Sequence, residues 1–371
     1  MLLLCCVFDT IALALGVLLV LRMRWRGVRI ELAGTVVAAS LLFGAISALT
    51  LHGGGFALMR GWAHALFCVL LPLLALRAVR IRGSAPRLAA LWLTAAALGT
   101  GCYVWARRVE PFRLEVTTAT VTSPRLQGLE RPLRLAVVAD LQTDAIGPFE
   151  VEVFDRLVEL APDLVLWLGD YLQLDAEAGA RELPALHAQL ARLQPRFGMF
   201  AVDGDVDGAL GGAAGVFAGT TVTVLDDASA SLAGVPIDLH GLSRMRSRAP
   251  LLDAGIVRRL PGKRFPILFG HAPDFMQAVL RGGLDADALM LAGHTHGGQV
   301  QVPGFGPLVT LSSVPRWLAG GGVFQRGASW LVCSRGIGME RGHAPRIRFA
   351  CRPQLIVLEL MAPAANSGLL R

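Results

Sequence analysis

Four long apolar stretches in the first third of the chain constrain its fold more than any other feature. They cover residues 2–21, 32–51, 56–76 and 88–106, and each is close to the roughly 20 residues with which a helix crosses a bilayer. The whole chain is 54% hydrophobic and only 17% charged, as expected when such segments are present. The sequence therefore predicts a membrane anchor of four transmembrane helices in residues 1–110 and a soluble domain in residues 111–371.

Arginines between these stretches indicate how the anchor is oriented. The first and third loops carry four arginines each, whereas the second carries only Arg60. By the positive-inside rule the first and third loops are cytoplasmic, which places both termini outside the cytoplasm. Arg107, Arg108 and Arg113 after the fourth stretch oppose this orientation. We expect a multi-pass membrane protein whose soluble domain is extracytoplasmic.

The basic excess of the chain belongs to the anchor. Residues 1–113 contain twelve arginines and three acidic residues, while the remaining residues contain 23 basic and 25 acidic ones. A soluble domain with this balance offers no basic face to nucleic acid. We therefore expect no nucleic-acid partner and instead expect contact with the lipid bilayer.

From Leu133 onward, short apolar runs alternate with segments of helical periodicity. Strands are predicted at Leu133–Val138, Leu164–Leu168 and Phe197–Val202, and the helices between them at Pro148–Leu160 and Arg181–Leu193. Further strands are predicted at 222–225 and 235–240, joined by a turn, and at 266–269, 288–292, 330–333 and 355–360. This order of elements predicts an α/β domain.

Several of these predicted strands end in residues that can bind a metal. The strand ends carry Asp140 with Gln142, Asp170, Asp205 with Asp207, His271, and His294 with His296. Any one of them alone is most simply a turn residue. Their recurrence at the carboxyl ends of strands in one domain favours a shared site. Carboxylate oxygens mixed with imidazole nitrogens suit Mn²⁺, Fe²⁺, Zn²⁺ or Mg²⁺, and a two-metal site of this kind implies hydrolysis of a phosphate ester or anhydride.

Taken in order, these motifs resemble those of the calcineurin-like metallophosphoesterases. That family's signature is Asp-x-His, Gly-Asp, Gly-Asn-His-Asp/Glu, Gly-His and Gly-His-x-His. The corresponding segments here are Asp140-Leu141-Gln142, Gly169-Asp170, Gly204-Asp205-Val206-Asp207, Gly270-His271 and Gly293-His294-Thr295-His296. Segments 334–338 and 348–353 resemble the end of the membrane-associated bacterial branch of the family, and the resemblance covers residues 131–360.

The resemblance implies a fold, a location and a ligand set. The implied fold is a four-layer αββα sandwich with the site above the strand ends, and the implied location is the bacterial inner membrane. Two divalent metal ions would share Asp170. One metal would take Asp140, Gln142 and His296, and the other would take Asp205, His271 and His294.

Three positions depart from the family pattern. Gln142 replaces a ligating His, Asp205 replaces a ligating Asn, and Val206 replaces the His that helps the leaving group depart. The two ligand changes make the site harder and more negative, so we expect Mn²⁺ or Mg²⁺ rather than Fe²⁺ or Zn²⁺. Val206 cannot donate a proton. Asp207, His240 and His343 are alternatives for that role, each with a structural role as the simpler interpretation. Asp170 and Asp207 are the expected catalytic residues.

Two functions are compatible with these observations. The first is a membrane-anchored, metal-dependent phosphohydrolase that acts on a phosphorylated lipid, a nucleotide-linked lipid or a small molecule. A pyrophosphate bond is the favoured substrate because its leaving group needs little proton donation. The second is a catalytically impaired binding or regulatory membrane protein that keeps the same fold. The changes at Gln142 and Val206 favour the second function, and the intact Asp140, Asp170 and histidines favour the first.

Two groups of residues near the carboxyl terminus have more than one interpretation. Arg335, Arg341, Arg346 and Arg348 would bind the substrate's charged groups, contact lipid headgroups or form a solvated basic loop. Cys333 and Cys351 would form a disulfide bond or remain two buried thiols.

Overall fold

Close contacts divide the chain into two units, each of which is described by itself. The computed structural model describes residues 42, 46, 54–252, 254–260, 262–284, 286–341 and 344–363. One unit comprises Met1–Val109 with Glu340–Arg346, and the other comprises Glu110–Met339 with Ile347–Arg371.

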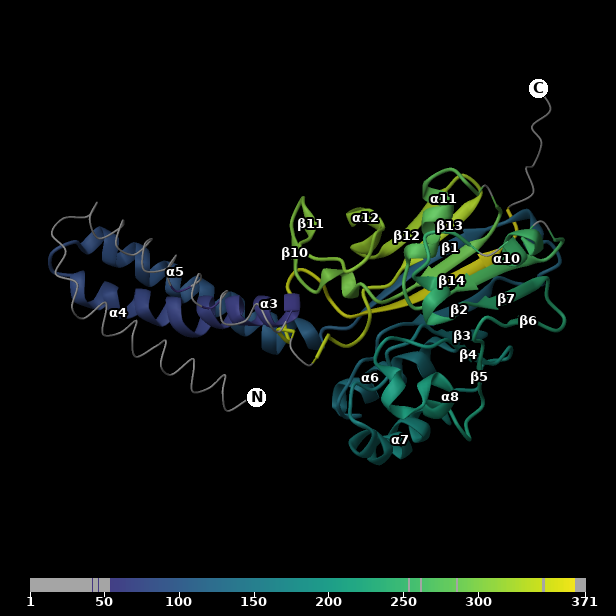
Figure 1. Ribbon diagram of the computed structural model, residues 1–371, viewed down its shortest axis with the longest axis horizontal. Helices are drawn as coiled ribbons and strands as arrows, with labels where there is room; N and C mark the ends of the chain where they lie inside the picture. Colours follow the sequence, from purple (N-terminus) through teal and green to yellow (C-terminus); the bar gives the residue numbers. More distant parts are fainter. Residues whose placement is uncertain are drawn as a thin grey trace, which may run out of the picture. The chain divides into compact units, whose positions relative to one another are not determined.

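Apolar helices in the first unit cover the third and fourth predicted transmembrane segments. Helix α3 (Gly54–His64) continues through a π-helical turn (Ala65–Leu70) into α4 (Leu71–Ile81), and α5 (Pro86–Val104) follows (Figure 1). Two stretches, Met59–Ile81 and Pro86–Phe112, are long and apolar enough to cross a membrane. The first two predicted segments lie outside the described residues, apart from Leu42 and Ile46, so the four-helix anchor stays a prediction.

Two six-stranded sheets form the second unit. In order across the first sheet lie β1 (Glu115–Thr122), β14 (Gln354–Met361), β2 (Leu133–Val138), β3 (Leu164–Trp167), β4 (Met199–Ala201) and β5 (Val222–Val224). Across the second lie β12 (Gly322–Arg326), β13 (Ser329–Cys333), β9 (Leu289–Ala292), β8 (Phe265–Phe269), β7 (Ile237–Gly241) and β6 (Ser229–Ser231). Strands β2 to β5 are parallel, as are β7, β8, β9 and β13. Parallel strands bring their carboxyl ends, and the loops that follow, to one edge of each sheet.

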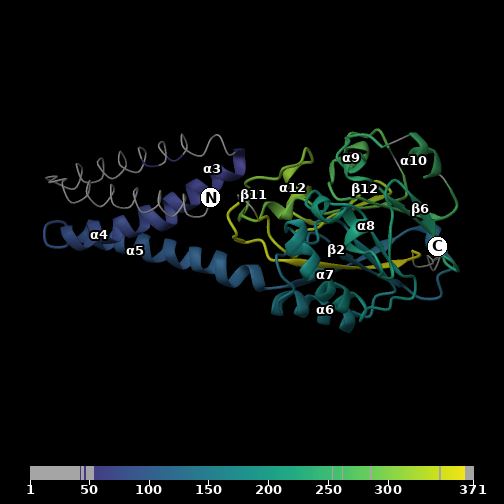
Figure 2. The ribbon, with the colours of Figure 1, turned by 60° about the horizontal axis from the view of Figure 1, so that its bottom comes forward.

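Helices cover the outer face of each sheet (Figures 1 and 2). On the first sheet these are α6 (Pro148–Leu160), α7 (Ala176–Leu190) and α8 (Gly212–Val216). Shorter helices accompany the second sheet: α9 (Arg244–Ser247), α10 (Ala254–Arg259), α11 (Gln277–Leu280) and α12 (Arg316–Ala319). The start of α6 is set locally, because Pro148 occupies its first turn and the Glu150 carboxylate accepts a hydrogen bond from the Gly147 N–H at 3.0 Å.

The side chains of β2 show how the layers are held together. Leu135 and Val137 belong to the apolar core shared by the two sheets, while Ala136 and Val138 belong to the core between the first sheet and its helices. Successive side chains of a strand point to opposite faces, so a strand buried on both faces is apolar throughout. A third core lies between the second sheet and α10 to α12. The predicted α/β organisation is therefore confirmed, with helices outside two packed sheets.

Some predicted elements differ from the structure. The strands predicted at 222–225 and 235–240 are not joined by a simple turn, because β5 lies in the first sheet, β7 lies in the second, and β6 comes between them. Helix α7 begins at Ala176 rather than Arg181, since the Asp175 side chain caps it by accepting a hydrogen bond from the Ala178 N–H at 2.8 Å. Strands β1 and β12 and the hairpin of β10 (Gln301–Val302) and β11 (Gly306–Pro307) were not predicted.

Candidate metal centre

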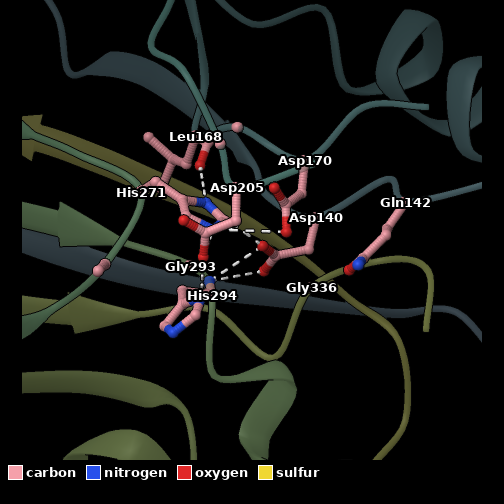
Figure 3. A network of polar contacts seen from close by, with 12 residues as sticks. Asp140, Gln142, Leu168, Asp170, Asp205, His271, Gly293, His294 and Gly336 are labelled. Atoms are coloured by element: carbon pink, nitrogen blue, oxygen red, sulfur yellow. Dashed lines mark hydrogen bonds and ion pairs between the residues drawn. The ribbon is translucent and has the colours of Figure 1, made fainter. Parts of the chain in front are cut away.

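The predicted metal ligands follow the carboxyl ends of five strands. Asp140 follows β2, Asp170 follows β3, and Asp205 follows β4 in the first sheet. His271 follows β8 and His294 follows β9 in the second sheet. Figure 3 shows the side chains of these residues converging from the two sheets on one place. The structure thus brings together five residues that lie up to 154 positions apart in the sequence.

Strained backbone is concentrated at these strand ends. Ten non-glycine residues in the described part of the chain have a positive φ, and half of them are predicted ligands. These five are Asp140 (49°), Gln142 (32°), Asp170 (56°), His294 (69°) and His296 (48°). Left-handed backbone is unfavourable for residues with a Cβ and persists where the surrounding structure enforces it, most often at functional sites.

Two glycines allow the loops to approach one another this closely. A Cβ on Gly204 would lie 2.1 Å from the Asp170 backbone nitrogen and 2.2 Å from its Oδ1. A Cβ on Gly293 would lie 2.7 Å from Asp140 Oδ2. Any side chain at either position would therefore displace a carboxylate of the site.

One group of potential ligand atoms comes from Asp140, Asp170 and His271. His271 Nε2 lies 3.4 Å from Asp170 Oδ2, and His271 Nδ1 lies 3.7 Å from Asp140 Oδ1. His271 Nδ1 donates a hydrogen bond to the Leu168 carbonyl oxygen at 2.9 Å. Because a carbonyl can only accept, this bond requires a proton on Nδ1, so Nε2 is the nitrogen available to a metal, and it faces the Asp170 carboxylate.

A second group comes from Asp205, His271 and His294 and shares His271 with the first. Asp205 Oδ2 lies 3.4 Å from His271 Nε2 and 3.2 Å from His294 Nδ1. The His294 ring is oriented by the Leu311 carbonyl oxygen, 3.2 Å from Nε2, so that Nδ1 faces Asp205. The backbone N–H of His294 also donates to both Asp140 oxygens, at 2.9 and 3.0 Å, which ties the two groups together.

The other two predicted ligands, His296 and Gln142, are buried, and His296 belongs to neither group. Both ring nitrogens of His296 are buried and form no hydrogen bond with any residue that the structure describes. The side-chain nitrogen of Gln142 donates to Gln173 Oε1 at 3.1 Å. An imidazole buried without hydrogen bonds is costly unless it binds something, so His296 suits a metal ligand.

Asp207, predicted to be catalytic, holds the loops of the site in place. Its carboxylate accepts hydrogen bonds from the backbone N–H groups of Gly204 (2.7 Å), Tyr171 (2.9 Å) and Asp170 (3.1 Å). These contacts support a positioning role, and the catalytic role stays a prediction. Of the alternative proton donors, His240 Nδ1 lies 2.8 Å from Ser229 Oγ within the β6–β7 pair, and His343 lies outside the described residues.

The electrostatics of the site favour bound cations. Burial, together with the charge of Asp170, raises the pKa of Asp140 to about 7. The same two causes raise the pKa of Asp207 to about 7. Burial lowers the pKa of His271, but the charge of Asp170 and the hydrogen bond of Asp205 outweigh it and raise the pKa to about 10. Several acidic groups crowded in a buried space hold protons unless a cation neutralises them. The donor set therefore fits divalent metals.

The pKa of His296 shifts in the opposite direction from that of His271. Burial, with the positive charge of Arg348 nearby, lowers the pKa of His296 well below its ordinary value. Its ring is therefore neutral at physiological pH, which is the form that binds a metal.

Arg248 is a site residue that the sequence did not reveal. It follows α9, and its Nη2 forms an ion pair with Asp205 Oδ2 and lies 3.3 Å from His294 Nε2. Arg248 belongs to no motif. The only available signal was its position in the loop after β7, a parallel strand whose carboxyl end lies at the same sheet edge as those of β8 and β9.

Arg348 also differs from its predicted roles. The side chain is fully buried, and its guanidinium donates to the carbonyl oxygens of Arg335, Gly336, Gly338 and Cys351. It therefore neither lies in a solvated loop nor faces a lipid surface. It secures the loop in which Gly336 packs against Asp140. Cys333 and Cys351 are both buried free thiols, which confirms the second of their two interpretations.

Comparison with known proteins identifies the class. A protein of Bacillus subtilis (strain 168) named "Uncharacterized metallophosphoesterase YkuE" is 30% identical over 288 residues, which cover 76% of this chain and 96% of that relative. "Phosphodiesterase YaeI" of Escherichia coli (strain K12) is 28% identical over 245 residues, or 62% of this chain and 83% of that relative. No protein-family model matches the chain. A dimetal phosphatase structure from Danio rerio is 12% identical, with a TM-score of 0.39, over 62% of this chain and 94% of that one.

The chain belongs to the calcineurin-like metallophosphoesterase superfamily, as its motifs predicted.

Proposed function

We propose that this protein is a phosphohydrolase that breaks a phosphoester or pyrophosphate bond with two divalent metal ions. The observation that carries the proposal is the convergence of two carboxylate and histidine groups that share His271. Asp170 would bridge the metals, with Asp140, Gln142 and His296 on one side and Asp205, His271 and His294 on the other. When bound, the two cations supply an activated water and neutralise charge on the phosphoryl oxygens.

The remaining residues of the site orient these groups. The Asp207 carboxylate holds the backbone of Asp170 and Gly204, and the Leu168 and Leu311 carbonyl oxygens hold the rings of His271 and His294. The Val206 N–H donates to Asp170 Oδ1 at 3.0 Å, which leaves Oδ2 facing His271. Such fixed geometry is what a metal site requires for activity.

Arg248 is proposed to assist the leaving group in place of a proton-donating histidine. Its guanidinium is half-exposed and pairs with Asp205. Asp205 directly precedes Val206, the position at which the family pattern has the proton-donating histidine. A guanidinium keeps its proton at neutral pH, so Arg248 would neutralise charge that develops on the leaving oxygen or the phosphoryl group. This role suits a leaving group that departs as an anion, such as the phosphate of a pyrophosphate.

The proposed substrate is a phosphorylated or nucleotide-linked lipid, and the proposed metals are Mn²⁺ or Mg²⁺. The two helices that are long and apolar enough to span a bilayer support a substrate found at a membrane. The carboxylate at position 205 and the amide at position 142 support hard cations over Zn²⁺ or Fe²⁺. A multi-pass location in a bacterial inner membrane, with the second unit outside the cytoplasm, is proposed from the loop arginines alone.

A screen of metals against substrates tests the function. The full-length chain in detergent micelles is stripped with a chelator, supplied with Mn²⁺, Mg²⁺ or Zn²⁺ in turn, and assayed on phosphomonoesters, phosphodiesters and pyrophosphates. We expect hydrolysis with Mn²⁺ or Mg²⁺, fastest on a pyrophosphate, and none in Asp170→Asn. Stoichiometric metal binding without hydrolysis of any substrate would instead support the alternative, a binding or regulatory membrane protein.

A further inference from the structure

Exposed apolar side chains gather on one segment of the second unit. They belong to Val302 (41% exposed), Phe305 (56%), Leu308 (51%), Val309 (37%), Leu311 (49%) and Trp317 (49%), and they are called the apolar hairpin surface below. The segment consists of the β10–β11 hairpin, the loop after it and the start of α12. Of the eleven exposed large hydrophobic side chains described in this unit, six lie in these sixteen positions. Single exposed hydrophobic residues are ordinary, but a contiguous group marks a surface that contacts something apolar.

The segment is held firmly against the metal centre. Gln301 Nε2 donates to the Gly297 carbonyl oxygen at 3.0 Å and to the Gly320 carbonyl oxygen at 2.7 Å, which fastens both ends of the hairpin segment. The Leu311 carbonyl oxygen lies 3.2 Å from His294 Nε2. One residue, Leu311, therefore contributes its side chain to the apolar hairpin surface and its backbone to the orientation of a metal ligand.

Charge around this surface identifies what it contacts. The sequence contains no Asp or Glu from Ala288 to Met339, and its charged residues there, apart from histidines, are Arg316, Arg326 and Arg335. The Arg316 guanidinium lies over the Phe305 ring, 4.4 Å from its centroid. The Asp274 carboxylate that reaches this segment is buried and accepts hydrogen bonds from Ser313, so the exposed charge within the surface is that of Arg316. Aromatic and aliphatic side chains beside an exposed arginine suit the headgroup region of an anionic bilayer. A protein partner would not require the one charged side chain among these residues to be positive.

We propose that the apolar hairpin surface inserts into the headgroup region of an anionic phospholipid bilayer. Insertion brings the metal centre next to the membrane surface, so the enzyme takes phosphorylated amphiphiles whose chains stay in the bilayer. The contact with lipid concerns binding alone, whereas the choice of substrate rests on the proposed function. The stretches Met59–Ile81 and Pro86–Phe112 are long and apolar enough to cross a membrane, and they would keep the molecule at a bilayer.

Photo-crosslinking tests the contact without reference to activity. The full-length chain carries p-benzoylphenylalanine in place of Phe305, is reconstituted in vesicles of phosphatidylglycerol and phosphatidylcholine, and is irradiated. The matched control carries the same group in place of Val158 on α6, which is 42% exposed. We expect lipid adducts at position 305, at least about fivefold more than at position 158. Adducts between two copies of the chain, adducts within one chain, or equal lipid labelling at both positions would each overturn the proposal.

Kinetics then test the consequence for the substrate. Phe305→Asp combined with Leu308→Asp is compared with Val158→Asp in the same vesicles. The substrates are water-soluble bis(p-nitrophenyl) phosphate and the membrane-embedded p-nitrophenyl hexadecyl phosphate. We expect the paired substitution to lower the rate on the embedded substrate at least about tenfold and to leave the soluble one unchanged. An equal loss of rate on both substrates, or no loss on either, would overturn the consequence. A wild-type chain inactive on both substrates would contradict the proposed function, and the crosslinking result would still decide the contact with lipid.

Discussion

The two sheets contribute chemically different halves of the metal centre. The first sheet supplies carboxylates, Asp140, Asp170 and Asp205, after β2, β3 and β4. The second sheet supplies imidazoles, His271 and His294, after β8 and β9, with His296 beyond them. All three departures from the family pattern, Gln142, Asp205 and Val206, lie on the first half, while the second half keeps its histidines.

This difference separates two tasks. The rings of the histidine half are oriented by the backbone carbonyl oxygens of Leu168 and Leu311, so side-chain changes in the first half leave these hydrogen bonds in place. The carboxylate half sets the total charge and the chemistry next to the leaving group. Changes confined to that half should alter metal preference and substrate range while the metal site itself persists.

Loss of Asp170, the proposed bridging carboxylate, should have the largest effect. Asp170→Asn should lower kcat/KM about 10³-fold or more, since it removes the ligand proposed to bridge both metals. Steady-state assays measure the rate, and metal analysis measures occupancy. The matched control, Asp155→Asn on the exposed face of α6, should keep full activity. Activity retained in Asp170→Asn would mean that the two halves do not form one catalytic centre.

Arg248 should come next. Arg248→Ala should lower kcat/KM about 10²-fold, with a loss that grows as the leaving group becomes more basic, because the guanidinium neutralises the leaving oxygen. Arg246→Ala is the control, since Arg246 is similarly exposed but pairs with Asp227 at 3.1 Å. A loss that is the same for all leaving groups would assign Arg248 a purely structural role.

A histidine at position 206 should restore the proton donor that the family pattern has in the first half of the site. Val206→His should raise hydrolysis of alkyl phosphodiesters about 10-fold, because an imidazole can protonate a poor leaving group. Val206→Gln, which has similar bulk but no acidic proton, should give no gain. Equal rates for the two variants would show that proton donation does not limit the reaction.

Metal affinity should rise with pH. Between about pH 4 and 7 the metal-free fold binds extra protons on Asp140 and Asp207, whose pKa values are raised to about 7, and up to about pH 10 it keeps one on His271. The metal-free fold therefore loses stability as pH rises through these values, and bound cations reverse the loss. Each coupled proton weakens metal binding about tenfold per pH unit below the pKa. The increase in Tm on adding Mn²⁺ should grow from pH 5 to pH 8; an increase that does not depend on pH would contradict this coupling.

Restoring the imidazole at position 142 should have the smallest effect. Gln142→His should shift the preference from Mn²⁺ toward Zn²⁺ about three- to fivefold, since imidazole is a softer donor than a carboxamide oxygen. Competition between the two metals, followed by metal analysis, measures the shift. Gln173→Ala, which removes the partner of the Gln142 amide, controls for a change in loop packing.

Local signals in the sequence determined much of the second unit. Strand β2 and helix α6 were predicted with their observed bounds, because an apolar run buried on both faces and a helix with Pro148 and Glu150 in its first turn are encoded by neighbouring residues. The aspartates and histidines of the site were predicted for the same reason, since each follows the end of a predicted strand and all except Asp140 stand next to a glycine.

Only the tertiary structure decided which distant groups meet. Strand β1 consists mostly of threonine with valine and alanine, and it becomes a strand by pairing with β14, whose first residue, Gln354, is far along the chain from Glu115. The roles of Arg248, Arg348 and Asp207 depend on contacts with atoms of other loops. The apolar hairpin surface is recognised only from the solvent exposure of its side chains in the folded domain. A sequence records which side chains can bind a metal or a lipid, but burial and distance depend on how the two sheets pack, and packing is a property of the whole domain.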